Sequence, residues 1–351
     1  MCTVQLAIIG CGQMAEKGHI PALGSVPDLD VVALVDPSEG RTRELAERLF
    51  PAGRRPECFT SVSSLLEKVQ VDAALVATPP STRHDTLRDL LAAGVHVLCE
   101  KPYASTGEEA DELLRLLDGS AGSVMMCHNY AFFPEFLEAG ELISSGAVGR
   151  VLGITIQCLG SYPWNGVAEY RPGWRYDPKI SGGGRLLDTG MHALYLAQDL
   201  VGEPLIDVVA SARFMPEPPV DRECFTFFRG ARTTVSLAVG EGHGPVSFDI
   251  LGEDGRVCLA YPRAAGDYGA APAEVRLYRS GELIESRPVS PHGMITPGLY
   301  GEWLRRISGG DRPYRHSARH GRDLLHIVLA TYRAALDGTR QLLPGQAAAR
   351  T

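Results

Sequence analysis

Residues 4–36 read VQLAIIGCGQMAEKGHIPALGSVPDLDVVALVD, and this stretch decides the fold of the first part of the chain. The apolar run over residues 4–9 predicts a buried strand, and the G-x-G-x-x-A turn after it leads into a helix-compatible segment. A second apolar run over residues 31–35 ends in Asp36, twenty-one residues beyond Ala15. This order of strand, glycine turn, helix, strand and acid predicts a dinucleotide-binding βαβ unit.

The glycine turn has the residue sizes that a bound pyrophosphate requires. Gly10 allows the tight turn, Gly12 lets the backbone approach the phosphates, and Ala15 lets the helix pack closely on the sheet. The phosphates would lie on free N–H groups at the positive end of the helix dipole. An ordinary βαβ unit with a glycine-rich turn is the alternative, but the position of the acid favours the nucleotide site. The predicted cofactor-binding residues of this unit are Gly10, Gly12, Gln13, Met14, Ala15 and Asp36.

Asp36 also bears on the choice of cofactor. Its carboxylate would accept hydrogen bonds from the adenosine ribose and would repel a 2′-phosphate, which favours NAD over NADP. Ser38 and Arg41 lie just beyond and are able to accept that phosphate, so NADP stays open as the alternative.

The composition excludes several classes of protein. A chain of 351 residues with 44% apolar and 22% charged residues predicts a globular protein of two domains. The net charge of −8 argues against a nucleic-acid partner, and no apolar run is long enough to span a membrane. The eight cysteines form no C-x-x-C pair, and no signal peptide is evident. We therefore expect free thiols, a cytoplasmic location and no metal ion.

The order of apolar runs predicts two architectures in succession. Short apolar runs alternate with helical patterns through the first third, which predicts an α/β fold with a doubly wound parallel sheet. From residue 204 to residue 287 strands follow one another without a long helix, which predicts an α+β domain with a large, open, mostly antiparallel sheet. The predicted domains are a Rossmann dinucleotide-binding domain, residues 1–123, and a substrate-binding and oligomerisation domain, residues 124–351.

A proline-containing loop, ATPPSTRH at residues 77–84, follows the strand that starts at Ala73. Ligands in doubly wound sheets bind at the carboxyl ends of strands, so this loop is predicted to line the adenine or ribose side of a crevice. Its predicted cofactor-binding residues are Thr78, Pro79 and His84. A rigid turn that caps the next helix explains the same residues, and both interpretations can hold together.

Two further stretches carry reactive side chains. Lys101, in the tripeptide Glu100-Lys101-Pro102, follows a predicted strand, and its ammonium would stabilise a developing alkoxide. Taken alone, this tripeptide is more often a surface turn.

The second stretch is GGGRLLDTGMH at residues 182–192. If residues 186–201 are helical, Asp188 and His192 share one face, and the histidine is suited to accept an alcohol proton. A packed or surface histidine is the alternative, and a metal site lacks an evident third ligand. His316 and His320 have the same spacing among arginines and are predicted to lie on a solvated surface.

The ordered set of these motifs resembles the Gfo/Idh/MocA family of NAD(P)-dependent sugar and cyclitol dehydrogenases. The matching segments are residues 10–15, 19–22, Asp36, 77–80, 100–102, 128–129, 173–175, 181–184 and Asp188-x-Gly190-x-His192. The resemblance implies that Lys101, Asp188 and His192 form the catalytic group. It also implies that Glu100, Lys101 and Asn129 lie beside the cofactor, and that the open sheet joins subunits in a dimer or tetramer.

One departure from the family pattern concerns the position three residues after the catalytic histidine. The family often has an acid there, whereas this chain has Tyr195, so the substrate pocket is expected to differ from that of inositol or glucose dehydrogenases. The segment that lines the sugar pocket in relatives supplies the predicted substrate-binding residues Tyr162, Trp164, Trp174 and Arg175. Aromatic faces suit sugar C–H surfaces, and a guanidinium suits hydroxyls or a phosphate.

The predicted function is hydride transfer between NAD(P) and a secondary alcohol or ketone of a sugar, amino sugar or cyclitol. A composition rich in alanine, glycine and arginine suggests, by analogy, the aminoglycoside and deoxysugar pathways of antibiotic biosynthesis. Two rival functions stay open: a glycosidase that uses NAD for transient oxidation, and a regulator that senses NAD without catalysis.

Overall fold

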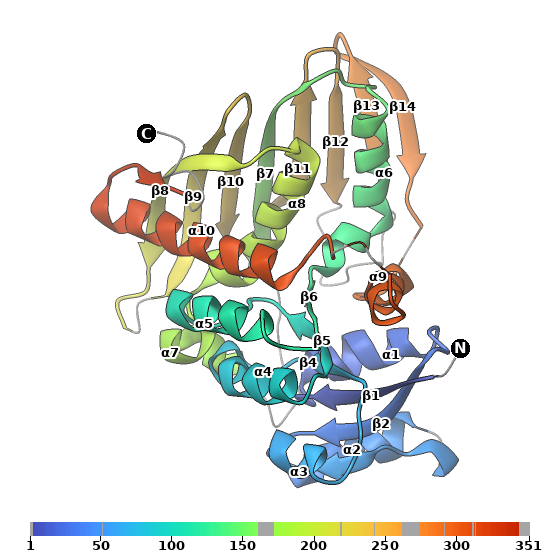
Figure 1. Cartoon of the computed structure of the whole chain (residues 1–351). Coiled ribbons are helices and arrows are strands. Elements are labelled where there is room, and N and C mark those ends of the chain that lie inside the picture. Colours follow the sequence, from blue (N-terminus) through green and yellow to red (C-terminus); the bar gives the residue numbers. More distant parts are fainter. Residues whose placement is uncertain are drawn as a thin grey trace.

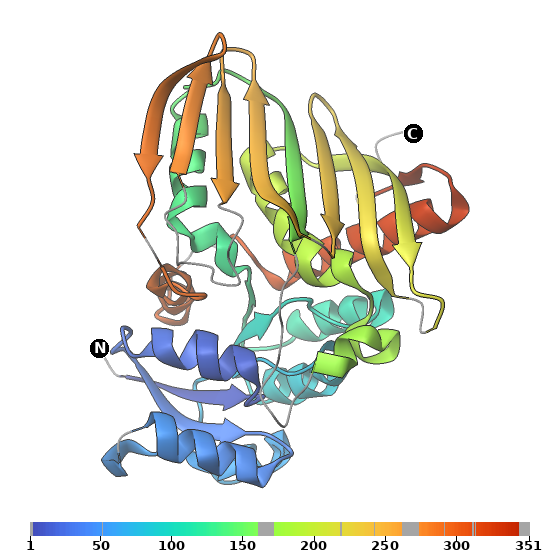
Figure 2. The ribbon, with the colours of Figure 1, turned by 180° about the vertical axis from the view of Figure 1, so that it is seen from behind.

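The computed structural model describes residues 3–50, 52–160, 172–217, 220–241, 243–261, 274–290, 292–310, 312 and 314–343. It contains two sheets, which lie one below the other in Figures 1 and 2. No helix in these ranges is long and apolar enough to cross a membrane.

The first sheet is the predicted parallel, doubly wound sheet, with six strands in the order β3-β2-β1-β4-β5-β6. The order reverses between β1 and β4, and this switch point is where doubly wound sheets bind ligands. The strands are β1 (Val4–Ile9), β2 (Leu29–Val35), β3 (Glu57–Phe59), β4 (Ala73–Val76), β5 (His96–Glu100) and β6 (Val124–Cys127).

Helical segments connect the parallel strands of this sheet. Thr106 and Glu109 form a capping box that begins α5, and Ser38 caps α2. The glycine turn leads into a π-helical segment that continues directly as α1. The segments are η1 (Met14–His19), α1 (Ile20–Leu23), α2 (Glu39–Leu49), η2 (Ala52–Arg54), α3 (Val62–Leu66), η3 (Pro80–Thr82), α4 (Arg83–Ala92) and α5 (Gly107–Leu117).

The edge strand β6 bears on the domain boundary. Val97 to Glu100 of β5 pair in parallel with residues 124–127, so β6 belongs to the first sheet. The boundary predicted after residue 123 separates this strand from the sheet that it completes. We propose that the first domain extends through Cys127.

The second sheet has nine strands in the order β14-β13-β12-β11-β7-β10-β9-β8-β15. All neighbouring pairs are antiparallel except β7 and β10, which confirms the predicted large, mostly antiparallel sheet. The strands are β7 (Val151–Gly160), β8 (Leu205–Phe214), β9 (Asp221–Gly230), β10 (Thr234–Gly240), β11 (His243–Gly252), β12 (Arg256–Tyr261), β13 (Glu274–Arg279), β14 (Glu282–Pro288) and β15 (Gln341–Leu342).

Three long helices, α6, α8 and α10, cover one face of this sheet, as Figure 1 shows. The opposite face, toward the viewer in Figure 2, has no long helix over it within the described ranges. The helical segments of this unit are η4 (Asn129–Phe132), α6 (Pro134–Ser144), η5 (Pro172–Tyr176), α7 (Pro178–Ser181), η6 (Leu186–Gly190), α8 (Met191–Val201), α9 (Pro297–Ile307) and α10 (Ala318–Asp337).

Helix α10 joins the two units, because it packs against both α5 and β8. Just before it, Ser317 forms an isolated bridge with Met125 of β6, and the Met126 amide donates to the His316 carbonyl at 2.7 Å. His316 is therefore fully buried and His320 is mostly covered. The prediction of a solvated surface for this pair was wrong, since the charged neighbours in sequence do not reveal that β6 packs against the start of α10.

Gly10 has a backbone conformation and surroundings that only glycine tolerates. Its φ is +93°, and a Cβ atom there would lie 2.8 Å from the backbone of Ala77 and Thr78. A Cβ on Gly12, in contrast, would meet nothing within 4 Å. The first glycine is thus required by the fold, whereas the second leaves open space above the turn.

We expect Gly10→Ala to destabilise the protein by about 1–3 kcal/mol, because it forces a positive φ and a backbone clash. Gly12→Ala is the matched control and should keep the melting temperature of the wild type. Differential scanning calorimetry should show a loss of roughly 3 °C or more for Gly10→Ala only. Equal melting temperatures for the two variants would contradict this account of the turn.

Candidate active site

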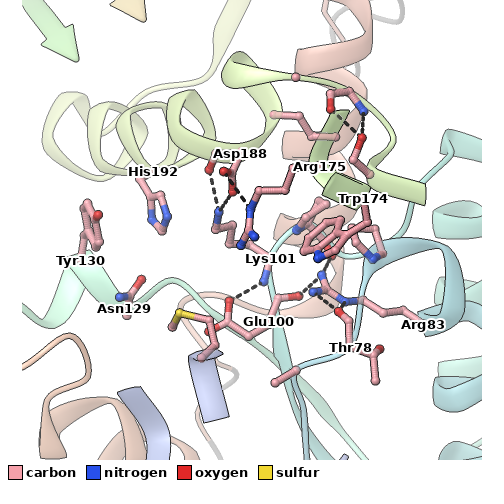
Figure 3. A pocket seen from close by; sticks show the side chains of 18 of the residues that line it. Thr78, Arg83, Glu100, Lys101, Asn129, Tyr130, Trp174, Arg175, Asp188 and His192 are labelled. Atoms are coloured by element: carbon pink, nitrogen blue, oxygen red, sulfur yellow. Dashed lines mark hydrogen bonds and ion pairs between the residues drawn. The ribbon is translucent and has the colours of Figure 1, made fainter. Parts of the chain in front are cut away.

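A pocket lies where the carboxyl ends of β4, β5 and β6 face η5, η6 and the start of α8. Figure 3 shows that Lys101 and Arg175 both point at Asp188, with His192 and Tyr130 to one side and Trp174 to the other. The lining includes the predicted site residues Met14, Thr78, Glu100, Lys101, Asn129, Trp174, Arg175, Asp188 and His192.

An ion pair between Lys101 and Asp188 joins the two units at this pocket. Lys101 Nζ donates to Asp188 Oδ1 at 2.8 Å and to the Asp188 carbonyl at 2.6 Å. Arg175 Nε lies 3.4 Å from Asp188 Oδ2. Burial favours the protonated acid, but these two cations outweigh it and hold the pKa of Asp188 well below its usual range. Asp188 is therefore a carboxylate that fixes the position of the ammonium.

His192 follows Asp188 by one helical turn and has different partners. Its Nδ1 lies 2.8 Å from the Tyr195 hydroxyl, and its ring stacks on Tyr130 at 4.1 Å between centroids. Burial lowers the pKa of His192, and the Lys101 cation lowers it further. The carboxylates of Asp188 and Glu100 act in the opposite direction but are outweighed, so the pKa is about 3. The imidazole is accordingly neutral at physiological pH and able to accept a proton.

Tyr195 is the site residue whose role the sequence analysis did not recognise. It is fully buried, its hydroxyl oxygen also accepts a hydrogen bond from the Tyr130 amide at 3.1 Å, and its ring stacks on His128. The hydroxyl thus orients His192 from the place where the family often has an acid. A neutral phenol does not stabilise an imidazolium as a carboxylate would, which agrees with the lowered pKa of His192.

Glu100 is held in a buried hydrogen-bonded chain. His19 Nε2 lies 3.0 Å from Glu100 Oε1, and His19 Nδ1 lies 2.7 Å from the Tyr300 hydroxyl. Burial would raise the pKa of Glu100, but the hydrogen bond from His19 and the charges of Lys101 and Arg83 lower it to about 2. Glu100 Oε2 accepts from the Lys101 amide at 3.2 Å, so this chain sets the backbone from which Lys101 projects.

Arg83 is a second residue that sequence reasoning missed as part of the site. Its buried guanidinium donates to the carbonyl oxygens of Thr78, Glu100 and Pro102. It thereby ties the loop after β4 to the segment after β5. In the sequence, the signal for this role was the position of Arg83 in the proline-containing loop.

His84, predicted to bind the cofactor, is not brought to the pocket lining. It is the second residue of α4, and its ring is turned toward α5, so that Nε2 lies 3.2 Å from Glu112. Its Nδ1 lies 3.3 Å from the neighbouring Asp85. The helical geometry that turns Arg83 inward directs the next residue outward. The loop therefore presents Thr78 and Pro80 to the pocket, while Pro79 lies beside them outside the lining.

Next to the pocket lie the glycine turn and Asp36, of which Met14 alone belongs to the pocket lining. Asp36 Oδ2 accepts from the Cys11 amide at 2.9 Å and Oδ1 accepts from the Ser38 amide at 3.0 Å. Together with the open space above Gly12, this arrangement fits the phosphates and ribose of a dinucleotide. The other predicted residues of the turn, Gly10, Gln13 and Ala15, lie in the same segment.

The remaining predicted residues have mixed outcomes. Asn129 lines the pocket and its Nδ2 donates to the Met294 carbonyl at 2.8 Å. Trp174 and Arg175 also line it, with the guanidinium carbon 4.4 Å above the Trp174 ring. Tyr162 and Trp164 lie outside the described residues.

The three glycines before η6 serve packing. A Cβ on Gly184 would lie 2.2 Å from the Asp221 carbonyl oxygen of β9. The buried Asp221 carboxylate accepts from the amides of Gly184 at 2.9 Å and Leu186 at 2.7 Å, which satisfies the first N–H groups of the helical segment. This close approach places Asp188 and His192 at the pocket.

A Rossmann sheet whose switch point faces a lysine, a carboxylate and an imidazole defines a dinucleotide-binding oxidoreductase of two units. Residues 4–128 match the model of the oxidoreductase family with an NAD-binding Rossmann fold, and residues 136–258 match the model of the GFO/IDH/MocA C-terminal domain. The chain belongs to the Gfo/Idh/MocA family.

Curated relatives include sugar oxidoreductases. The chain is 26% identical to levoglucosan dehydrogenase of Pseudarthrobacter phenanthrenivorans, over 84% of this chain and 83% of the relative. It is 26% identical to dTDP-3,4-didehydro-2,6-dideoxy-alpha-D-glucose 3-reductase of Saccharopolyspora spinosa, over 88% and 90%. It is 29% identical to Oxidoreductase P35 of Formosa agariphila over 57% of this chain. There the chain spans only 61% of the relative's length.

Solved structures share the whole fold. An aldose-aldose oxidoreductase from Caulobacter crescentus has a TM-score of 0.83 at 21% identity, over 97% of this chain and all of that one. The WlbA dehydrogenase of Bordetella pertussis, crystallised with NADH and UDP-GlcNAcA, has a TM-score of 0.77 at 22% identity, over 97% and 99%. KijD10 of Actinomadura kijaniata, a 3-ketoreductase crystallised with NADP, has a TM-score of 0.80 at 21% identity, over 95% and 98%.

We expect His192 to stay neutral between pH 8 and pH 5, because its lowered pKa lies below this range. His292 is the internal control, since its hydrogen bond to Glu135 outweighs burial and raises its pKa, so that it titrates above the ordinary value. Nitrogen-15 NMR of histidine-labelled protein, with His192 assigned by His192→Gln, measures both.

Lys101→Met removes a cation near His192 and should raise its pKa in the same NMR titration. A wild-type His192 that titrates near 6.5, or a pKa unmoved by Lys101→Met, would show that the ammonium does not control the imidazole.

Proposed function

We propose that the protein is an NAD(P)-dependent dehydrogenase or ketoreductase that acts on a secondary alcohol or ketone of a sugar, amino sugar or cyclitol. The observation that carries this proposal is the convergence of Lys101, Asp188 and His192 beside the crevice of the glycine turn. These residues come from two different units, and a structural role in either unit alone would not require that they meet.

The residues that would hold a nicotinamide dinucleotide are Gly12, Asp36 and Asn129, with Met14 and Glu100 in the same pocket wall. When bound, such a cofactor supplies the hydride acceptor for oxidation or the hydride donor for reduction. The side chains of this chain then have to place the substrate carbon, polarise its oxygen and handle the hydroxyl proton.

His192 is suited to take the hydroxyl proton. If its Nδ1–H donates to the Tyr195 oxygen, the lone pair of Nε2 is free to accept a proton. The Tyr195 oxygen has two lone pairs and can accept from His192 and from the Tyr130 amide together. The phenol therefore selects the ring orientation in which His192 acts as a general base.

Lys101 is suited to polarise the same substrate oxygen. Asp188, whose other carboxylate oxygen pairs with Arg175, holds the Lys101 ammonium in place, so the donor is oriented before substrate binds. A fixed cation beside a developing alkoxide stabilises the transition state more than the neutral alcohol. In the reduction direction the same cation polarises the ketone and His192 returns the proton.

The contacts of Arg41 support a preference for NAD over NADP. Its guanidinium is buried and paired with Glu16 and Glu44, and its Nε donates to the Cys11 carbonyl. The Ser38 hydroxyl caps α2 by accepting from the Arg41 amide. Arg41 and Ser38, the two candidates for binding a 2′-phosphate, thus already have partners, and the Asp36 carboxylate would repel that phosphate.

The substrate class is supported by the pocket wall and by relatives. Trp174 offers an aromatic face and Arg175 offers donors to hydroxyl groups. Two relatives that align with most of the chain are named as a levoglucosan dehydrogenase and as a 3-reductase of a dTDP-linked didehydro-dideoxyglucose. A role in antibiotic biosynthesis would follow if the substrate is a deoxysugar or an aminoglycoside.

We also propose that the open face of the nine-stranded sheet joins subunits in a homo-oligomer. Phe225 and Phe227 on β9 are 52% and 48% exposed, and Val209 on β8 pairs directly with Phe227. An exposed apolar patch of this kind marks a protein interface. The described cysteines are free thiols, which supports a reducing compartment such as the cytoplasm.

Spectrophotometry with a panel of sugars, amino sugars, glycosides and cyclitols tests the activity. We expect NADH to accumulate with NAD and at least one free polyol, and NADPH to accumulate more slowly when NADP replaces NAD. Lys101→Met and His192→Gln should each lower kcat/KM by about 10²–10⁴-fold, because they remove the polarising cation and the base. Lys68→Met, an exposed lysine on the first unit, is the control and should keep wild-type activity.

The rival functions give different results in this assay. Release of a free sugar from a glycoside without accumulation of NADH would identify a glycosidase. Tight NAD binding with no turnover on any compound would identify a regulator. Full turnover by both Lys101→Met and His192→Gln would refute the catalytic assignment.

The pair Phe225→Glu and Phe227→Glu should convert the oligomer to a monomer, because two carboxylates would be buried in the interface. Size-exclusion chromatography with light scattering measures the mass. Leu336→Glu, at an apolar and even more exposed position on α10, is the control and should leave the mass unchanged. A wild-type monomer of 37.8 kDa would contradict the proposed interface.

A further inference from the structure

Three histidine rings meet where the first sheet touches α10, outside the pocket described above. His128 follows β6 directly, His316 lies two residues before α10, and His320 lies in its first turn. The Nδ1 atom of His316 lies 3.1 Å from His128 Nδ1 and 3.2 Å from His320 Nδ1. His128 and His316 are fully buried.

Hydrogen bonds alone do not account for this arrangement. An imidazole nitrogen has one in-plane site, which holds either a proton to donate or a lone pair to accept. His316 Nδ1 has two nitrogen neighbours at hydrogen-bond distance, so it can satisfy only one of them. The other contact is then at best a bent hydrogen bond that shares the same proton or lone pair, and otherwise sets two lone pairs or two N–H groups against each other in a buried place.

The rings are in the state that a metal ion requires. Burial, with His320 and Arg315 nearby, lowers the pKa of His316 to about 2. Burial with Arg315 nearby lowers the pKa of His320 to about 4 against the effect of Asp323. The pKa of His128 is also well below its ordinary value, because of burial and the neighbouring histidines. All three rings are therefore neutral at physiological pH and offer lone pairs.

The outer nitrogens show the beginnings of a supporting shell. Metal-bound histidines usually donate their second N–H to a carboxylate, carbonyl or similar acceptor. His320 Nε2 lies 3.3 Å from Gln198 Oε1, and His316 Nε2 lies 3.6 Å from Asp199 Oδ2. Asp199 also pairs with Arg315 at 3.1 Å, so its carboxylate is held beside the cluster.

We propose that His128, His316 and His320 bind one zinc ion through their Nδ1 atoms. Tetrahedral zinc with Zn–N bonds of 2.0–2.1 Å separates two ligand nitrogens by about 3.4 Å, close to both measured separations. A set of neutral nitrogen ligands without thiolates or carboxylates suits zinc better than magnesium or calcium. The sequence analysis expected no metal, because it placed two of these ligands on the surface.

A second cluster of potential ligands, His19, Glu100 and Cys127, serves as the rival site. Its geometry is already explained, because each nitrogen of His19 has its own oxygen partner, Tyr300 or Glu100. Burial raises the pKa of Cys127 well above its ordinary value, so the thiol keeps its proton. This cluster needs no cation.

The ion would act on structure at the junction of the two units. It would join the end of β6 to the start of α10, beside the bridge between Met125 and Ser317. The His128 ring also stacks on Tyr195 at 4.2 Å, and Tyr195 orients His192. Loss of the ion should therefore lower the melting temperature even where no substrate or cofactor is present.

Metal analysis of the full chain tests the proposal. Protein produced in zinc-supplemented medium and dialysed should contain about one zinc ion per chain by plasma mass spectrometry. X-ray absorption should show nitrogen ligands at about 2.0–2.1 Å and no sulfur at about 2.3 Å. This measurement uses the wild type alone, so it decides the ligand set even if a variant fails to fold.

Variants then locate the ion. His320→Asn should weaken zinc binding at least about 100-fold and Gln198→Ala about 10-fold, because the first removes a ligand and the second an outer partner. His326→Asn, on the same helix and bound to Asp111, is the control and should bind zinc like the wild type. Chelation should lower the melting temperature of wild type and His326→Asn but not of His320→Asn.

Three results would overturn the proposal. The first is less than about half a zinc ion per chain in the wild type, with no saturable binding on titration of the metal. The second is equal zinc affinity in His320→Asn and the wild type. The third is a zinc–sulfur shell together with loss of zinc in Cys127→Ser, which would place the ion in the rival cluster.

Discussion

The ion pair between Lys101 and Asp188 is the contact on which the site depends. Lys101 follows the last residue of a parallel strand in one sheet, and Asp188 lies in the helical segment that packs against the other. Neither charge would be stable there alone, because an unpaired charge in a largely covered pocket loses hydration without compensation. The pair therefore fixes the distance between the two units at the place where they enclose the pocket.

The residues around this pair are arranged in two supporting groups. Around Lys101, Arg83 and the chain from Tyr300 of α9 through His19 to Glu100 fix the backbone on either side of the lysine. On the second unit, Asp221 holds the amides at the start of η6, and Tyr195 holds His192. Most of this support comes from buried polar groups with defined partners, which specify one geometry where an apolar core would allow several.

Much of the fold could be predicted from local patterns. The apolar runs identified five of the six parallel strands, and the glycine turn with Asp36 identified the βαβ unit, because these signals are carried by adjacent residues. The three-residue edge strand β3 (Glu57–Phe59) was missed, because it is too short to show a pattern. The pocket lining brings together Lys101, Asp188 and His192, which the motifs had singled out. The predicted boundary after residue 123 leaves β6 outside the first domain, although β6 pairs with the first sheet. An edge strand has the same sequence pattern whichever sheet it joins.

What local patterns missed depended on contacts between distant segments. His316 is surrounded in sequence by arginines, yet β6 covers it, and no periodicity in either segment reveals that contact. His84 followed the expected motif but faces α5, because the helix begins one residue earlier. The partner of His192 could not be read from spacing either, since a tyrosine in place of an acid changes the chemistry while it keeps the position.

The two borders of the nine-stranded sheet differ from its open face. The outer strand β14 carries Glu282, Glu285 and Arg287, and the opposite border is β15, only two residues long. Charged or abbreviated borders resist the addition of further strands, which would otherwise extend without limit into fibres. The proposed interface on the open apolar face would pair two copies about a twofold axis, and growth would then stop at a closed assembly.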